Sequence, residues 1–494
     1  MNIHTDKCET CGVRGLFPAL AITGVSAAAL LLSGCKGTTI KGEREARQQV
    51  QAVSESYRPN GHKPALPVLT TNSTLADFLT YALLNQPKVE AAYFDWLASV
   101  ERITVERSLP DPQLTFQMDI QDVVTSLMPG LMMTFPGAGK LRAAGTLAAA
   151  ASQTKYFAFE TASLESAYEV KRAYYQLHFL AEKIRVNRET LSLLSDLEKL
   201  ARAQNDVGKV TLQDVLRAQI EQDRLKNDLA NLEDSHGALV ARFKAALGMR
   251  ADEPAPPVPE RLESTSLDLT SEKLFETALA HNTRLKGMEA EVRAADAAIT
   301  QAYKARMPDV TAGFMADVKM SPTLYRPWGT VSLPLWRDKL AAQVAEAQSK
   351  KRADEALLSA EQIALAADFA ERLFLYREAT RNVELLQNQL LPRQRQSLEV
   401  ARVGYLAGQI DFFNLTDAEQ TLLRFGLDEV EARTQRELSL IELSLMIQGL
   451  PLSGASIAAT PARGMATTGA GMSSGAVGML PGNSAPPPKN KGGM

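Results

Sequence analysis

"VGKVTLQDVLRAQ", residues Val207 to Gln219, interrupts a region that is otherwise strongly helical. Residues 141–205 contain no proline and are rich in Ala, Leu, Glu, Lys and Gln, which favour helix. Gly208 can adopt the positive φ that ends a helix. Thr211 can then cap the next helix, with Asp214 in its first turn. The stretch therefore predicts a hairpin of two helices with a short turn.

The stretch has a second copy in the chain. It returns about 200 residues later as "AGQIDFFNLTDAEQ", with Gly408 as the turn glycine. Three other landmarks return in the same order at a similar distance: "YALLNQP" (81–87) as "TALAHNT" (277–283), "LPDPQLTF" (109–116) as "MPDVTAGF" (307–314), and "TFPGAGKLRAA" (134–144) as "SLPLWRDKLAA" (332–342). The chain is therefore an internal duplication.

The helices of each repeat are too long for a compact domain. The first runs for roughly 65 residues, which is about 100 Å at about 1.5 Å per residue. The helix after the turn carries coiled-coil spacing, through Leu225, Leu229, Leu232, His236, Leu239, Phe243 and Ala246. Such helices must lie side by side in a rod, tube or coiled coil.

Each repeat also contains a pair of short extended segments. In "QLTFQMDIQ" (113–121), apolar and polar residues alternate as in a strand with one apolar and one polar face. "TSLMPG" (125–130) and "KMSPTLYRP" (319–327) are expected to be the hairpin turns, which leaves about 8 to 10 residues per strand. Four strands cannot close a membrane barrel, since even the smallest need about eight. The pattern favours an oligomer, and the alternative is a small soluble β-layer packed on the helices.

The N-terminus predicts a lipid anchor. An apolar run at 15–32 leads into Leu32-Ser33-Gly34-Cys35, which matches the bacterial lipobox. Residues 1–34 would be a signal peptide and Cys35 would carry a covalent lipid; an ordinary signal peptide or anchor is the alternative. Lys36 stands where an aspartate would indicate inner-membrane retention, so the outer membrane is favoured. The other cysteines, Cys8 and Cys11, lie in the segment to be removed.

Composition divides the remaining chain. Residues 35–72 are expected to form a lipid-anchored, loosely packed N-terminal arm. The first repeat covers residues 73–250, a proline-rich linker 251–266, and the second repeat 267–451. Residues 452–494 are rich in Gly, Ala, Pro and Met and are expected to be disordered.

Several functional classes are disfavoured. A net charge of -3 without a basic excess gives no sign of nucleic-acid binding. Five scattered histidines lack metal-ligand spacing, so no metal site is predicted. "GAGK" (137–140) lacks the rest of a P-loop and is expected to be a strand-to-helix corner. Because no nucleophile and base pattern is present, we expect no enzyme and no cofactor apart from the lipid.

The lipobox, the duplicated helix–hairpin–long-helix order, Leu109-Pro110-Asp111-Pro112 and the glycine turns together resemble the TolC family of outer-membrane efflux proteins. The resemblance implies a mainly α fold with a small β part. Three protomers would form an α-barrel tunnel of long antiparallel helices and a twelve-stranded β-barrel. It also implies a passive duct that works with a periplasmic adaptor (membrane fusion) protein and an inner-membrane RND or ABC pump. "SLPDPQL" and "TFPGAGKLRAAG" resemble the heavy-metal branch of RND efflux in particular.

The resemblance also indicates a site at the hairpin tips. The aperture acids of the family fall on Asp214 and Arg217 in the first repeat and on Asn414 and Asp417 in the second, and the family tyrosine is Tyr405. The family's latch arginine falls on Ile410, so that latch is not expected here. An inward-facing acid would occur three times around one axis and attract cations. The alternative is that Asp214 only starts its helix.

Two other functions fit the same patterns. A duct for type I protein secretion would use the same tube. A lipid-anchored periplasmic coiled-coil scaffold would have long helices but no pore. The alternating strands favour the duct, because a scaffold has no need for hairpins with one apolar face.

Overall fold

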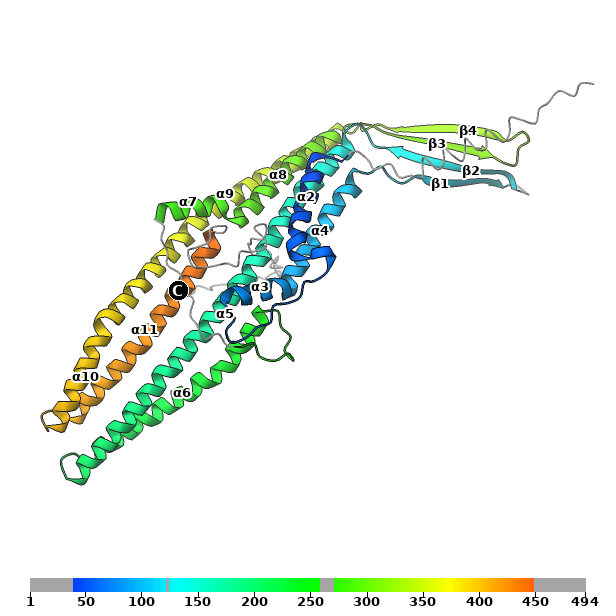
Figure 1. Ribbon diagram of the computed structural model, residues 1–494. Coiled ribbons are helices and arrows are strands. Elements are labelled where there is room, and N and C mark those ends of the chain that lie inside the picture. Colours follow the sequence, from blue (N-terminus) through cyan, green and yellow to red (C-terminus); the bar gives the residue numbers. More distant parts are fainter. Residues whose placement is uncertain (1–38, 121–123, 258–270, 448–494) are drawn as a thin grey trace, which may run out of the picture.

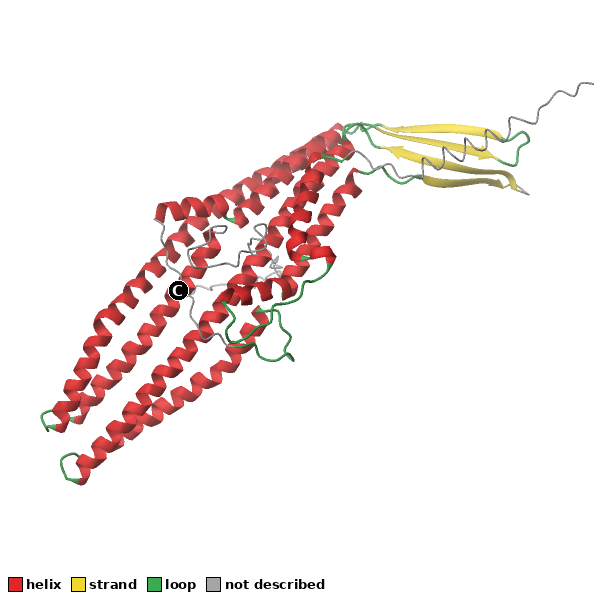
Figure 2. Cartoon of the chain, in the orientation of Figure 1, coloured by secondary structure: helices red, strands yellow, loops and turns green. Residues whose placement is uncertain are grey.

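The computed structural model describes residues 39–120, 124–257 and 271–447. Long helices lie side by side, a four-stranded sheet extends from one end of them, and two helical hairpins form the other end (Figures 1 and 2). Cys35, most of the predicted linker and the C-terminal tail lie outside the described residues. The predicted fold class, mainly helical with a small four-stranded sheet, is confirmed.

The two repeats place similar elements in the same order. The first contains α3 (Leu75–Asn85), α4 (Pro87–Arg107), β1 (Gln113–Ile120), β2 (Val124–Phe135), α5 (Lys140–Asp206) and α6 (Leu212–Ala246). The second contains α7 (Ser271–His281), α8 (Thr283–Lys304), β3 (Asp309–Asp317), β4 (Leu324–Ser332), α9 (Arg337–Leu385), a π-helical segment (Leu386–Leu390), α10 (Leu391–Leu406) and α11 (Phe412–Ile447). Helix α2 (Lys41–Tyr57) precedes both.

Helix α5 is the longest element of the fold. Its 67 residues correspond to about 100 Å, as the sequence predicts. It contacts α4, α6, α8 and α11, so it joins both repeats. Buried aromatic side chains of α5, including Tyr174 and Phe179, pack with residues of α3, α6 and α11 in the largest core cluster. The rod is therefore stabilised by packing along its whole length.

The predicted seam of α6 is only partly correct. Leu225, Phe243 and Ala246 are buried, but His236 is exposed. No helix among the described residues combines the length and the apolar character needed to cross a membrane.

The sheet has the order β1-β2-β3-β4 and is antiparallel throughout. Alternation and register place one set of side chains on one face. That set is entirely apolar or glycine: Leu114, Phe116, Met118, Ile120, Leu127, Pro129, Leu131, Met133, Phe135, Val310, Ala312, Phe314, Ala316, Tyr325, Pro327, Gly329 and Val331. Leu114 and Phe116 are 67% and 69% exposed in the single chain. The sheet thus has one continuous apolar face that this chain leaves uncovered.

The predicted hairpin turns are misplaced. "TSLMPG" (125–130) lies inside β2, which runs for 12 residues rather than 8 to 10. Within β2, Pro129 pairs with Phe116 of β1. The second predicted turn, 319–327, is partly wrong because β4 already begins at Leu324. Proline and glycine favour turns and are uncommon inside strands. Here both are paired with β1, Pro129 with Phe116 and Gly130 with Thr115.

The expected strand-to-helix corner joins the two repeats. Gly139 has φ +83° and precedes Lys140, the first residue of α5. The Lys140 ammonium lies 2.8 Å from the Asp309 carboxylate, and the Gly137 N–H donates to the same oxygen at 2.7 Å. "GAGK" therefore ties the end of β2 to the start of β3.

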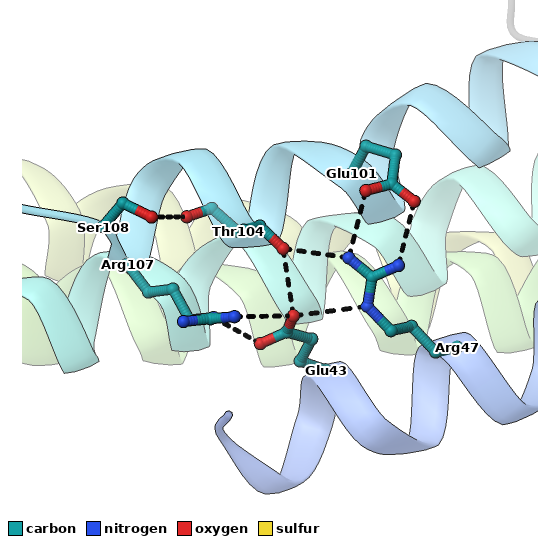
Figure 3. Close-up of polar contacts among 6 residues, drawn as sticks. All are labelled: Glu43, Arg47, Glu101, Thr104, Arg107 and Ser108. Atoms are coloured by element: carbon teal, nitrogen blue, oxygen red, sulfur yellow. Dashed lines mark hydrogen bonds and ion pairs between the residues drawn. The ribbon is translucent and has the colours of Figure 1, made fainter. Parts of the chain in front are cut away.

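The prediction of a loosely packed N-terminal arm is wrong for residues 41–57. Helix α2 packs on α4 and α5, with Val53 and Tyr57 in a shared core. At its first turn the buried Glu43 accepts hydrogen bonds from Arg107, Thr104 and Arg47 (Figure 3). Burial alone would raise the pKa of Glu43, but these bonds hold it below its usual value. The sequence signal missed here is the helical spacing of Glu43 with Ala46, Val53 and Tyr57, which are all buried on one face of α2.

The second long helix differs from α5 because it changes pitch. Residues Leu386–Leu390 form a π-helical segment between α9 and α10. Pro392 follows it, and a proline removes one donor and crowds the carbonyl four residues earlier, at Asn388. A π segment is one way in which a helix accommodates such a misfit.

Candidate functional site at the hairpin tips

Both hairpins turn with the same backbone geometry. Gly208 has φ +69° and Gly408 has φ +75°. In each turn the glycine N–H donates to a carbonyl three residues back, and the next N–H donates to one five residues back. Nothing lies within 4 Å of a Cβ built on either glycine, so backbone conformation rather than crowding accounts for glycine here.

In the first hairpin, Asp214 closes the cap of α6. The Thr211 backbone N–H and hydroxyl donate to Asp214 Oδ2 at 3.2 and 3.1 Å. Asn205 also donates from its side chain to the carbonyl of Val210 at 2.8 Å. Asp214 therefore has the helix-start role that the sequence left open as the alternative. Its second oxygen remains available to other groups.

In the second hairpin, the acid occupies a different cap position. Asp411 precedes α11 and accepts the Asn414 backbone N–H at 3.0 Å. Asn414 therefore takes the position of Asp214, and Asp411 takes that of Thr211. The sequence analysis did not select Asp411, although an aspartate directly before a helical run is a cap signal.

The hairpins share one apolar core above their turns. It includes Leu197 and Ala201 of α5, Val215 of α6, Tyr405 of α10 and Leu415 of α11. The Tyr405 ring lies 5.5 Å from the ring of Phe412, and its hydroxyl is buried with no hydrogen-bond partner in the part of the chain described. Burial, with Asp214 nearby, raises the pKa of Tyr405 to about 12. Tyr405 therefore stays a neutral phenol with a free donor.

A pocket of ≈ 340 Å³ separates the two tips. Lys209, Thr211 and Asp214 line it from the first hairpin, and Tyr405 and Asp411 line it from the second. The structure thus brings together two of the predicted aperture residues, Asp214 and Tyr405. It adds Lys209 and Asp411 to them.

Ile410, at the latch position, is part of the apolar packing. Its side chain packs against the shared core and lies 3.2 Å from a Cβ built on Gly404. An arginine there would place a charge at the edge of an apolar cluster.

The other predicted aperture residues lie outside the pocket. Asn414 and Asp417 are exposed and three residues apart on α11, so they share one face. Arg217 is exposed at the equivalent place on α6. Within the residues described, neither Asp417 nor Arg217 has an ion-pair partner. In the single chain these charges therefore face solvent.

A buried carboxyl that the sequence analysis did not select lies about two turns into α11. Glu419 of α11 is 1% exposed, and neither of its oxygens has a hydrogen-bond partner in the described residues. Burial, with Glu221 of α6 nearby, raises the pKa of Glu419 to about 8. The available signal was a glutamate between Ala418 and Leu422, in apolar helical spacing.

The arrangement supports gating or binding rather than covalent chemistry. No group of three or more His, Cys, Asp or Glu in residues 39–120, 124–257 and 271–447 is placed to hold a metal ion. The tips offer carboxylates, one phenol and one lysine around a small pocket. Such groups can form and break hydrogen bonds between hairpins as the hairpins move.

Comparison with known proteins gives a family and a fold. The sequence matches the family described as "Outer membrane efflux protein" over residues 79–249 and 274–448. No curated protein sequence matches the chain.

Solved structures of outer-membrane channels share the fold. VceC from Vibrio cholerae is 16% identical, with a TM-score of 0.64 over 76% of this chain and 95% of that one. CusC is 15% identical, with a TM-score of 0.67 over 78% and 98%. CmeC from Campylobacter jejuni is 12% identical, with a TM-score of 0.65 over 80% and 91%. At these identities the similarity shows the fold alone, and the predicted TolC-like architecture is confirmed.

Proposed function

The chain belongs to the outer membrane efflux protein family, and from this premise we propose that it is the channel component of a tripartite efflux system. In this proposal three copies form a passive duct from the periplasm to the exterior. The duct works with a periplasmic adaptor protein and an inner-membrane RND or ABC pump, and it performs no reaction of its own.

The observation that carries the proposal is the sheet. Its apolar face is uncovered, and the outer edges of β1 and β4 have no partner strand among the described residues. In a bilayer every backbone N–H and C=O must be paired, which requires a closed barrel. One chain supplies four strands, and three chains supply the twelve that close such a barrel.

The hairpin tips would form the closable periplasmic end of this duct. Three-fold symmetry would repeat Asp214, Tyr405 and Asp411 around the axis, with Asp417 and Arg217 on the exposed faces. Because Arg217 and Asp417 occupy equivalent places, opposite charges would alternate from hairpin to hairpin. Rings of carboxylates attract cations, and they repel one another as the tube narrows.

Lipid attachment at Cys35 fits the position of α2. The Ile40 side chain lies 3.3 Å from a Cβ built on Gly145, which is also next to Arg107 at the end of α4. This is the end of the helical body from which β1 departs (Figure 1). A lipid five residues before Ile40 would thus lie near the membrane side of the duct. Replacing Cys35 with Ala should abolish lipid labelling, and unchanged labelling would contradict the anchor.

The cargo we propose is a metal ion or another small molecule. "SLPDPQL" and "TFPGAGKLRAAG" support the heavy-metal branch. A type I secretion duct would use the same tube. The cargo of the inner-membrane pump that works with this chain distinguishes protein secretion from efflux of small molecules. Export of a metal by cells that carry the duct and its own pump would support the branch.

The test of the channel is conductance. The purified lipidated protein should be a trimer in mild detergent and should form pores in planar bilayers. Asp417→Ala should change conductance or cation selectivity, whereas Gln420→Ala, also exposed three residues later on α11, should not. A monomer without conductance would instead favour the coiled-coil scaffold.

A further inference from the structure

The face of the sheet opposite to the apolar one carries methionines at its centre. On this polar face Thr115 of β1 pairs with Gly130 of β2, and Gly130 pairs in turn with Met315 of β3. Met128 and Met132 lie two residues before and two residues after Gly130, so alternation places them on the same face. Three methionines therefore surround one glycine.

The space above Gly130 is filled by its neighbours. A Cβ built on Gly130 would meet Met315 Cγ and the Thr115 hydroxyl, so both side chains lean over the glycine. Met128 is 2% exposed, whereas Met132 and Met315 are half-buried. Met315 therefore lies over the middle of the group, between one covered methionine and one that is partly open.

The rest of this face does not resemble an apolar core. Apart from Leu324 and Trp328, the other side chains paired on it are polar or glycine: Gln113, Thr115, Gln117, Asp119, Ser126, Gly130, Thr134, Asp309, Thr311, Gly313, Asp317, Arg326, Thr330 and Ser332. Leucine would give similar burial at the methionine positions. The property that the three methionines share and leucine lacks is a polarisable thioether sulfur. Gap-filling is the alternative, since methionine adapts to irregular spaces.

We propose that Met128, Met132 and Met315 bind a soft monovalent metal ion, of the class of copper(I) and silver(I), through their sulfur atoms. Thioethers favour copper(I), whereas hard cations such as Mg²⁺ and Ca²⁺ require oxygen ligands. Because Met315 lies over Gly130, it is the ligand that the other two share. Met128 and Met132 are each about 7 Å from Gly130 along the strand, at about 3.4 Å per residue, and the three rotatable bonds of a methionine let its sulfur reach inward.

The groups around the methionines suit such an ion. The Thr115 hydroxyl is buried without a hydrogen-bond partner in the described residues, so it can offer an oxygen lone pair at the same place. Arg326 pairs with Met315, and Asp317 lies two residues after Met315 on the same face. Their charges are opposite, and Asp317 already accepts a hydrogen bond from the Ser126 hydroxyl at 2.8 Å. The site therefore has little net charge.

The role of the site in transport rests on the proposed function, to which it adds a class of cargo. In the proposed duct the apolar face meets the bilayer, so the polar face lines the lumen. Three copies of the chain would place three such sites at one level. Conduction requires a site that both binds an ion and releases it. A neutral thioether suits this task, because it holds a soft ion less tightly than a thiolate does.

Binding of silver(I) to the purified lipidated trimer in detergent tests the site. Met132→Leu with Met315→Leu keeps the apolar volume and removes two sulfur atoms. Since loss of an outer-shell partner alone costs about 10- to 100-fold in metal affinity, loss of two ligands should weaken silver(I) binding by at least about tenfold. X-ray absorption at the metal edge should show sulfur neighbours in the native protein and fewer of them in the variant.

The sheet offers a matched control in Met118→Leu with Met133→Leu, which removes two methionines from the apolar face. This control should bind silver(I) as the native chain does. Residues 36–494 contain no cysteine, and any binding by Cys35 or by methionines elsewhere is common to all these proteins. Among single variants, Met315→Leu should lower the affinity more than Met128→Leu or Met132→Leu, because it removes the shared ligand.

The outcomes separate the site from the duct. Equal silver(I) affinity in the Met132/Met315 variant and in the control would overturn the site, and a trimer that conducts in both would leave the proposed channel intact. Loss of the trimer in the Met132/Met315 variant alone would assign these methionines to packing and would also overturn the site. A native monomer that binds silver(I) through sulfur but does not conduct would overturn the channel and leave the site.

Discussion

The two repeats of this chain build the same strand hairpin and the same glycine turn, but their helices differ. In the first repeat α5 is unbroken over 67 residues, and α2 covers α4 through a buried ion cluster. In the second, the long helix contains a π segment before Pro392, whereas α2 packs on α4 and α5 of the first repeat. The repeats agree in the register of their strand hairpins and in the geometry of their glycine turns. They differ in helix packing, so the first repeat is expected to be the more rigid of the two.

Removing the ion cluster of α2 should have the largest effect. Glu43→Ala would leave the Arg107 side chain, 9% exposed, without its carboxylate. Breaking a buried pair by removing one partner costs about 3 to 5 kcal/mol. We expect amide protection of α2 to fall by that amount in hydrogen exchange, while protection of α9 stays unchanged.

The matched control for α2 is Lys41→Ala, which removes only an exposed pair with Glu45. Because the pKa of Glu43 is lowered in the folded chain, the stability that it contributes is present above its unfolded pKa. It is lost as pH falls below that value. Protection of α2 should therefore fall less with decreasing pH in Glu43→Ala than in the native chain, where Glu43 adds to the acid dependence of the Arg47–Glu101 pair. Equal protection in both variants at neutral pH would contradict the role of the cluster.

The continuity of α5 can be broken by placing a proline where the second repeat has one. Ser192 is exposed and lies 200 positions before Pro392. A proline inside a helix costs about 3 kcal/mol, so Ser192→Pro should lower the unfolding free energy by about that amount. Ser192→Ala is the control. In the second repeat, Pro392→Ala should stabilise the helix, and a loss of stability there would show that the π segment is not a response to proline.

Glu419 gives the second repeat a pH dependence opposite to that of Glu43. Its pKa is raised to about 8 in the folded chain, so the folded state holds a proton that the unfolded state releases. Stability should fall as pH rises from the unfolded pKa to about 8, by up to about 1.4 kcal/mol per pH unit. Glu419→Gln should remove this slope in thermal unfolding between pH 5 and 8. The neighbouring exposed Gln420→Ala should keep it, and an unchanged slope in Glu419→Gln would assign it to another group.

The sequence predicts most of this fold because its signals repeat. Four landmarks at a similar spacing give the duplication, and alternating residues give the strands. The turn in "TSLMPG" was wrong because Pro129 fits a strand once the apolar face is formed by its neighbours. The packing of α2 was missed because it depends on Arg107, 64 residues away. Local patterns cannot report such pairing.

The hairpin tips show the same limit on a smaller scale. Gly208, Gly408 and Asp214 could be found from local signals, since each acts on its own backbone. Glu419 leaves only an indirect signal, its place in the apolar spacing of α11, because its burial depends on the other helices that pack around the tips. A sequence can predict how a residue affects its own turn. Which other helices pack around that turn is seen only in the structure.

The smallest expected effect is a difference between the N-terminal caps of α6 and α11. Asp411→Ala removes the acceptor of the Asn414 N–H and should cost about 1 kcal/mol, whereas Asn414→Ala should cost almost nothing. In the first hairpin the acid is the third helical residue instead, because Asp214 accepts the N–H and the hydroxyl of Thr211. Asp214→Ala should therefore cost about 1 kcal/mol at the position where its second-repeat counterpart costs little. Hydrogen exchange of the first turns of α6 and α11 measures all three variants. If Asn414→Ala destabilises α11 as much as Asp411→Ala does, the third helical residue stabilises the cap in both hairpins. The proposed difference between the two caps would then be wrong.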